Sequence, residues 1–291
     1  GGWRTLDSRG PMALPDLSRC ALHTITTKPW SLEQCVAGCQ QAGINAITVW
    51  RNALEPYGAR RAGEILRAAG MRVPALCRGG FFPAVDAAKR QAALDDNRRA
   101  IDDAATIGAE MVVLVCGAVP GMPLPEARRQ IAEGIAAIAP HACASGVRLA
   151  IEPMHPAYAG DCSAISTMRQ ARLICEQMPW RGRDGYPVVG IAADVYHVWW
   201  DDALEDEIAI AGAKGYLQGF HVCDWKLAQS DLLNDRGLMG EGCIDIATIR
   251  GWVERAGFTG FNEVEIFSDR YWQMDQSEWL QRIVAAYLAH V

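Results

Sequence analysis

Residues 188–194 read Val-Val-Gly-Ile-Ala-Ala-Asp, a short apolar run that ends in a carboxylate. Three other runs have the same form: Leu-Ala-Ile precedes Glu152, Leu-Gln-Gly-Phe precedes His221, and Phe-Asn-Glu-Val precedes Glu265. Buried parallel strands read as short apolar runs of this kind. Strands that each deliver one polar side chain at the carboxyl end are what a parallel barrel needs to hold a metal at its mouth. These four runs therefore predict both a fold and a site.

Strand-like runs alternate with helix-like segments along the whole chain. Ser31 and Gln34 have the spacing of a capping box, and glycines follow several helical stretches as C-caps. The Ala-rich run 86–107 has the spacing of a peripheral helix. The expected strands span 20–25, 45–50, 72–76, 111–116, 147–152, 188–194, 217–222 and 261–266. Eight β/α units without a GxGxxG or P-loop sequence predict a (βα)8 barrel rather than a doubly wound sheet.

Length and composition fit one large domain. The chain has 291 residues, is 50% hydrophobic and contains no linker-like tract. We expect a single barrel domain over 13–291, preceded by an N-terminal extension over 1–12 that lies outside the fold. The ten cysteines include no CxxC pair, which favours free thiols in a reducing compartment over a zinc cluster or a disulfide framework.

Net charge and hydropathy limit the classes of molecule that this protein is expected to bind. The net charge is -6 and no cluster of Lys and Arg stands out, which argues against nucleic acid and anionic membranes. A small molecule is therefore the favoured partner. No apolar stretch has transmembrane length, and the first residues lack the apolar centre of a signal peptide, so we expect a cytoplasmic protein.

Acidic and imidazole groups concentrate on the last four expected strands. Three carboxylates and one imidazole, from Glu152, Asp194, His221 and Glu265, form an oxygen-rich set that suits Mn²⁺, Mg²⁺ or Co²⁺. One carboxylate at a strand end is more often a helix cap or an ion-pair partner, but four together favour a metal site. Glu263 lies two residues before Glu265, so both point to the same side of the expected strand and Glu263 competes for the ligand role. We prefer Glu265, because it lies one layer nearer the expected mouth.

The other strand ends and the loops after them supply candidates for substrate contacts. Flat rings among them can stack on a sugar or on an aromatic aglycone. His23 fits the core and the site equally well. The candidates for substrate contacts are Trp50, Arg51, Arg78, Trp199, Asp224, Trp225 and Arg236.

Five motifs resemble, in order, those of the xylose isomerase-like, sugar phosphate isomerase/epimerase superfamily. They are Ile-Glu-Pro-Met-His-Pro at 151–156, Ala-Asp-Val-Tyr-His-Val-Trp-Trp at 193–200, Phe-His-Val-Cys-Asp-Trp at 220–225, Gly-Glu-Gly-Cys-Ile-Asp at 240–245 and Gly-Phe-Thr-Gly-Phe-Asn-Glu-Val-Glu-Ile-Phe at 257–267. The resemblance spans about 20–267. It implies a TIM barrel with His197 as a substrate contact and one divalent metal held by Glu152, Asp194, His221 and Glu265.

The resemblance also bears on the chemistry. In ketose epimerases of this superfamily the two ligating glutamates exchange protons with the substrate carbon, which implies Glu152 and Glu265 as the acid/base pair. Where many relatives carry Asn after the Glu-Pro pair, this chain has His155, a candidate base that can titrate near neutral pH. The large subunit of the C-glycoside deglycosidases is similar in this respect. It works with a small β-type partner subunit and cleaves 3-keto glycosides by elimination.

The sequence therefore predicts a metal-dependent sugar isomerase or epimerase that removes a proton next to a carbonyl and acts through an enediolate. The alternative is a lyase on 3-keto C- or O-glycosides, and either a homo-oligomer or a complex with a small β-type subunit fits. Endonuclease IV has the same barrel, but its three-metal site needs more histidines and a basic face. A non-enzymatic carbohydrate-binding protein stays open, and a measurement of bound metal would separate it from the enzymes.

Overall fold

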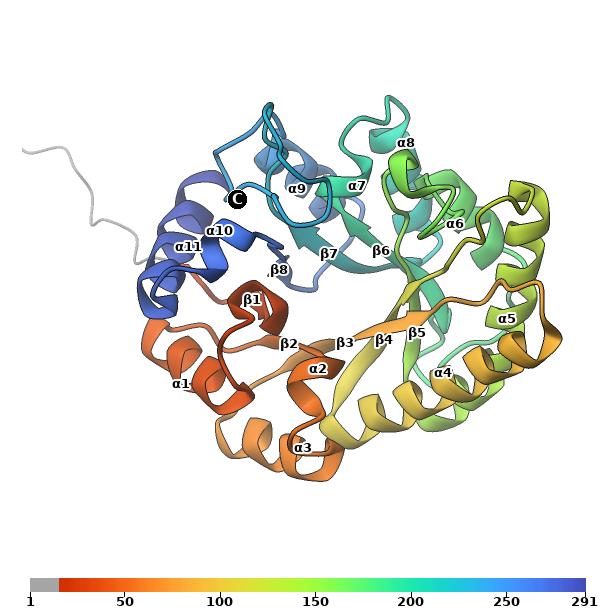
Figure 1. Cartoon of the computed structure of the whole chain (residues 1–291), viewed down its shortest axis with the longest axis horizontal. Coiled ribbons are helices and arrows are strands. Elements are labelled where there is room, and N and C mark those ends of the chain that lie inside the picture. Colours follow the sequence, from red (N-terminus) through yellow and green to blue (C-terminus); the bar gives the residue numbers. More distant parts are fainter. Residues whose placement is uncertain (1–15) are drawn as a thin grey trace, which may run out of the picture.

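Eight parallel strands close into a barrel in the computed structural model, which describes residues 16–291 (Figure 1). Neighbouring strands follow the chain order, and β8 pairs with β1 to complete the ring. The expected extension over 1–12 lies outside the described residues. The strands are β1 Cys20–His23, β2 Ile47–Trp50, β3 Val73–Gly80, β4 Ala109–Val115, β5 Arg148–Ile151, β6 Val189–Asp194, β7 Leu217–Val222 and β8 Asn262–Val264.

The predicted barrel and its eight strands are confirmed, with shifted strand ends. The largest difference is in β3, which was expected to end at residue 76 and instead continues to Gly80. A Cβ at Gly80 would lie 1.9 Å from the carbonyl oxygen of Val115, and the residue has a φ of +108°. Only glycine tolerates this approach and this backbone conformation, so the strand stays paired with β4 beyond its apolar run.

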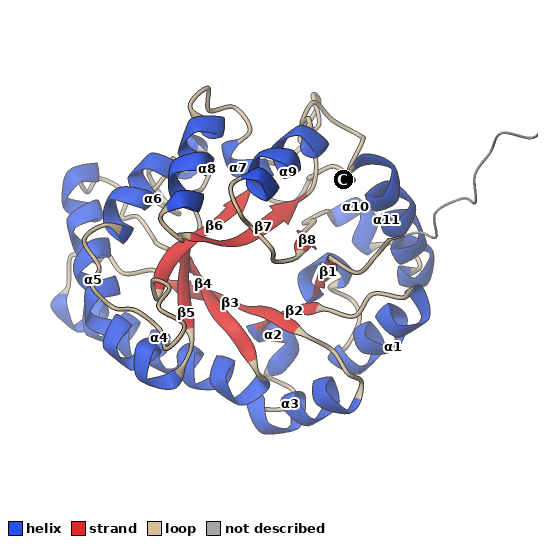
Figure 2. Ribbon diagram, turned by 180° about the vertical axis from the view of Figure 1, so that it is seen from behind, coloured by secondary structure: helices blue, strands red, loops and turns tan. Residues whose placement is uncertain are grey.

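Helices surround the barrel on the outside (Figure 2). The capping box predicted at Ser31 and Gln34 is present at the start of α1. The long helix expected over 86–107 is α4, with Asp86 as its N-cap. The longer helices are α1 Leu32–Ala42, α3 Ala59–Ala68, α4 Ala87–Ile107, α5 Leu124–Ser145, α6 Met168–Cys175, α8 Leu204–Ala213, α9 Ile246–Arg255 and α11 Gln276–His290.

Shorter helical turns lie after several strands. Among them, α7 places His197 directly after β6. Of the helices in residues 16–291, none combines the length and the apolar character that a membrane span needs. The turns are η1 Thr24–Thr27, α2 Arg51–Leu54, η2 Pro156–Tyr158, α7 Val195–Val198 and α10 Asp269–Trp272.

Apolar side chains fill the inside of the barrel below its mouth. This inner cluster is separate from the larger core between strands and helices, and it comprises Ala75, Cys77, Met111, Val113, Ala150 and Ala192. Because side chains alternate along a strand, Glu152 follows Ala150 and Asp194 follows Ala192 on the same inward face. The polar groups therefore form the layer above the inner cluster, at the carboxyl ends of the strands.

The packing of α8 on α9 gives a test of the fold. A Cβ at Gly212 in α8 would lie 2.3 Å from the backbone oxygen of Ala256 at the end of α9. We expect Gly212→Ala to lower the free energy of unfolding by about 1–3 kcal/mol, because backbone would have to move. Gly251→Ala in α9 is the control, since only a side-chain atom of Arg255 comes near, at 3.5 Å.

Alanine favours a helix over glycine, so the control should raise the free energy of unfolding by roughly 0.5–1 kcal/mol. Urea denaturation of both variants measures the difference. A stabilised Gly212→Ala variant would contradict the close packing of the two helices.

Candidate functional site

Four buried side chains converge at the carboxyl end of the barrel. One donor atom from each of Glu152, Asp194, His221 and Glu265 lies within 4.8 Å of all the others. Nδ1 of His221 is 3.2 Å from Oε2 of Glu152 and 3.6 Å from Oε2 of Glu265. Glu152 directly follows β5, Asp194 ends β6, His221 lies in β7 and Glu265 directly follows β8. The structure thus brings together the four residues singled out in the sequence, and we call this group the four-donor cluster.

Arg236 adds the positive charge that contacts this cluster most closely. Its guanidinium is buried, with Nη1 2.9 Å from Oδ2 of Asp194 and 3.3 Å from Oε2 of Glu265. Burial raises the pKa of Asp194 well above its ordinary value. Arg236 lowers this pKa, whereas the negative charges of Glu265 and Glu152 raise it further. The guanidinium therefore does not by itself offset the cost of burying the Asp194 carboxylate, and a bound cation would.

His197 lies beside Arg236 at the edge of the cluster. Its Nδ1 accepts the backbone N–H of His155 at 3.1 Å, and its Nε2 is 3.2 Å from Nη2 of Arg236. Burial, with Arg236 nearby, holds the pKa of His197 well below its ordinary value, so the imidazole is neutral. A neutral imidazole has one acceptor nitrogen, and both partners can only donate. With Nδ1 as the acceptor, His197 and Arg236 present two adjacent N–H groups that suit one shared oxygen acceptor.

Glu263 occupies the layer below Glu265 and does not join the four-donor cluster. Its Oε1 accepts hydrogen bonds from Oγ1 of Thr48 at 2.6 Å and from Nε2 of His23 at 3.0 Å. His23, His221 and Glu263 are also close enough to hold an ion. However, the indole of Trp50 donates to Nδ1 of His23 at 2.9 Å, which leaves the imidazole proton on Nε2. His23 is then a donor to Glu263 rather than a metal ligand.

Aromatic rings line one side of the mouth. The ring of Trp225 stacks on His155 with centroids 4.8 Å apart, and Trp199 lies 5.8 Å from Trp225. Nδ1 of His155 accepts the backbone N–H of Ala157 at 3.1 Å, and burial lowers the pKa of this imidazole. His155 therefore belongs to an aromatic wall near the cluster, where it contacts the backbone N–H of its own turn.

Several other candidates for substrate contacts have partners elsewhere. Arg51 forms two hydrogen bonds with Asp96 on α4, at 2.8 and 2.9 Å. The guanidinium of Arg78 lies over the ring of Phe81, 4.7 Å from its centroid. The buried carboxylate of Asp224 accepts three backbone N–H groups of its own loop, from Trp225, Gly240 and Ile244.

Two residues near the site were not singled out from the sequence. Thr48 lies two residues before Trp50 in β2, so both side chains face the barrel interior. The alternation of side chains along this strand could have pointed to Thr48. The ring of Tyr196 lies under Arg236, 4.2 Å from the guanidinium carbon, and packs 4.8 Å from Trp225. No sequence pattern pointed to Tyr196, because its partners come from the loops after β7.

Comparison with known families agrees with this architecture. The sequence matches the family model described as a xylose isomerase-like TIM barrel over residues 36–285. The chain belongs to the xylose isomerase-like TIM barrel family. A search of curated proteins finds no match.

Solved structures include a protein of Sinorhizobium meliloti 1021 that is 45% identical to this xylose isomerase-like barrel, with a TM-score of 0.89 over 94% of this chain and 99% of the other. The IOLI protein with a bound zinc atom is 20% identical, with a TM-score of 0.80 over 94% and 98% of the two chains. The 3-keto-D-glucoside 4-epimerase of E. coli is 14% identical, with a TM-score of 0.72 over 94% and 99%. At these lower identities the likeness shows the fold.

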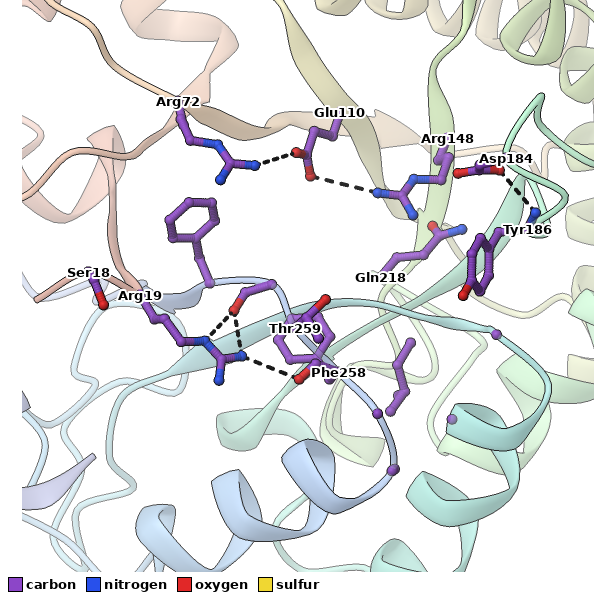
Figure 3. Close-up of a pocket in the computed structure, with 17 residues that line it drawn as sticks. Ser18, Arg19, Arg72, Glu110, Arg148, Asp184, Tyr186, Gln218, Phe258 and Thr259 are labelled. Carbon is purple, nitrogen blue, oxygen red and sulfur yellow. Dashed lines mark hydrogen bonds and ion pairs between the residues drawn. The ribbon is translucent and has the colours of Figure 1, made fainter.

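A cavity of about 560 Å³ opens at the other end of this xylose isomerase-like barrel (Figure 3). Arginines line it, but they pair locally: Arg72 contacts Glu110 at 3.2 Å, and Arg19 contacts the carbonyl of Gly260 at 2.7 Å. Active sites of such barrels lie at the carboxyl ends of the strands. The four-donor cluster, rather than this cavity, is therefore the candidate site.

The hydrogen bonds of Asp224 predict a positioning role for this carboxylate in its loop. In Asp224→Asn one carboxylate oxygen becomes an N–H donor that cannot accept backbone N–H groups. We expect faster amide hydrogen exchange across residues 225–244 in this variant. Asp231→Asn is the control, because Asp231 is exposed and accepts one N–H of the same loop. Unchanged exchange in Asp224→Asn, together with weaker substrate binding, would instead assign Asp224 to the substrate.

Proposed function

We propose that this protein is a divalent-metal-dependent sugar isomerase or epimerase that removes a proton next to the carbonyl of a keto-sugar or keto-glycoside. The observation that carries the proposal is the buried four-donor cluster at the barrel mouth, with the donors of His197 and Arg236 beside it. Solved structures of the same fold include the 3-keto-D-glucoside 4-epimerase and an L-ribulose 3-epimerase, which support this class of substrate.

The donor set fits a hard divalent cation. Glu152, Asp194, His221 and Glu265 would hold it, and three carboxylates with one imidazole favour Mn²⁺, with Mg²⁺ or Co²⁺ as alternatives. A cation there would supply Lewis-acid stabilisation of negative charge on a substrate carbonyl oxygen and its neighbouring hydroxyl.

The side chains of the cluster supply the proton transfers in this proposal. One of Glu152 and Glu265 removes the proton next to the carbonyl, and the other delivers a proton to the resulting enediolate. The N–H groups of His197 and Arg236 bind a sugar oxygen and orient the substrate. Protonation of the same carbon from the opposite face gives an epimer. Protonation of the neighbouring carbon, with the hydroxyl proton moving between the two oxygens, gives an isomer.

His155 favours one alternative, a lyase that eliminates the aglycone of a 3-keto glycoside. Its ring lies in the aromatic wall with Trp225, which suits a flat aglycone. However, Nδ1 of His155 is the acceptor of the Ala157 N–H, so protonation there would cost this hydrogen bond. We therefore keep Glu152 and Glu265 as the proposed acid/base pair and His155 as the candidate base of the elimination.

Metal content tests the proposed centre directly. We expect the purified protein, supplemented with Mn²⁺ and then desalted, to retain about one equivalent per chain by elemental analysis. Asp194→Ala should remove it, because one ligand is lost and Arg236 then pairs with Glu265 alone, in competition with the ion. Asp231→Ala, which changes an exposed carboxylate, is the control and should retain the ion. Less than about a tenth of an equivalent in the wild type would contradict the site.

The fate of the enediolate decides between isomerase and lyase. In D₂O, proton exchange at the glutamates should place deuterium on the reacting carbon of a free ketose product. The panel should contain free ketoses and 3-keto glycosides, each followed by mass spectrometry, with Asp194→Ala as the inactive control. We expect deuterium in a free keto-sugar. Release of aglycone from the glycosides, with no isotope uptake in any free sugar, would contradict the isomerase and favour the lyase.

A further inference from the structure

Glu263 is a buried carboxylate to which the proposed chemistry gives no role. It is 2% exposed and lies on the same face of the chain as Glu265, two residues nearer the barrel interior. Its Oε1 accepts the hydroxyl of Thr48 from β2 and the imidazole N–H of His23 from β1. A carboxylate buried at this depth, with two donors on one oxygen, is held in a fixed position.

Trp50 fixes the direction of this network. An indole N–H can only donate, so Nδ1 of His23, 2.9 Å away, must be the acceptor. The proton of His23 is then on Nε2 and is directed at Glu263. Nδ1 of His23 also approaches Oε1 of Glu265, but at 3.4 Å this contact is longer than the bond from Trp50. The shorter, well-directed bond defines the tautomer.

His221 contacts Glu263 through the nitrogen that faces away from the four-donor cluster. Its Nδ1 faces Glu152 and Glu265, whereas its Nε2 is buried without a hydrogen-bond partner, 3.6 Å from Oε1 of Glu263. A metal binds an unprotonated imidazole nitrogen, so binding through Nδ1 requires the proton on Nε2. A carboxylate beside Nε2 stabilises this tautomer and makes Nδ1 the better ligand.

We propose that Glu263 is a positioning residue that orients His221 and fixes its tautomer for metal binding, and that Trp50, His23 and Thr48 hold Glu263 in place. The proposal rests on the metal centre of the proposed function. It gives the indole N–H of Trp50 a structural role inside the barrel. It also explains why Glu263 in β8 and Glu265 just after it point to the same side of the chain: the outer one binds the ion, and the inner one supports a ligand.

Metal affinity tests this role without an assay of activity. Glu263→Gln keeps the size of the side chain and an oxygen acceptor but removes the charge. We expect its Kd for Mn²⁺, measured on the whole chain by competition with a chromogenic chelator, to rise by about tenfold or more. Glu207→Gln is the matched control, since Glu207 is also buried but pairs with Arg172 on the outer helices. The control should bind Mn²⁺ with the Kd of the wild type.

A spectroscopic measurement separates positioning from general destabilisation. The chain has six histidines, so ¹⁵N labelling of histidine with Zn²⁺ bound gives an assignable spectrum. We expect the wild type to show His221 protonated on Nε2, with a proton signal protected from solvent exchange. In Glu263→Gln this signal should shift or lose its protection, while the signals of His141 and His290 stay unchanged.

The outcomes distinguish this proposal from the proposed function. If the wild type binds Mn²⁺ and Glu263→Gln binds it equally well, the positioning role is overturned and the metal centre stands. If the wild type binds no Mn²⁺, both are overturned. Should Glu263→Gln fail to fold, Thr48→Val removes one donor to Glu263 and keeps the charge. A Kd raised several-fold in Thr48→Val would support the proposal, and an unchanged Kd would overturn it.

Discussion

Closure of eight parallel strands in chain order is the constraint on which the site depends. A closed barrel has one inner face, and the alternation of side chains along each strand assigns every second residue to it. Small residues such as Ala150 and Ala192 fill the deeper layer, and Glu152 and Asp194 follow them at the mouth. Four strand ends that are distant in sequence thereby place their donors within 4.8 Å of one another.

The second feature is the excess of negative charge that this geometry creates. Carboxylates removed from water are costly unless they are paired or bind a cation. Arg236 contacts Asp194 and Glu265, and Glu263 is held by Thr48 and His23. The deeper carboxylate is thus satisfied by hydrogen bonds, whereas Asp194 and Glu265 share one guanidinium and Glu152 lies beside the imidazole of His221. This division supports a catalytic role for the upper layer and a supporting role for the lower one.

Sequence alone predicted the barrel, its strands and the residues of the four-donor cluster, because these follow from local apolar runs and strand parity. Glu263 competed with Glu265 because both point to the same side of the strand, and Glu265 was preferred because it lies one layer nearer the mouth. The sequence also could not predict which side chains from distant elements would pair with one another. Arg51 pairs with Asp96 on α4, and Asp224 accepts the N–H of Gly240, so neither contact is visible in a local pattern.

The location of a bound ion tests the central claim most directly. Crystals of the protein grown with Mn²⁺ can be measured at the manganese absorption edge, where anomalous differences identify the metal. We predict a single strong peak within coordination distance of Glu152, Asp194, His221 and Glu265. A peak between His23, His221 and Glu263, or none at the barrel mouth, would contradict the account.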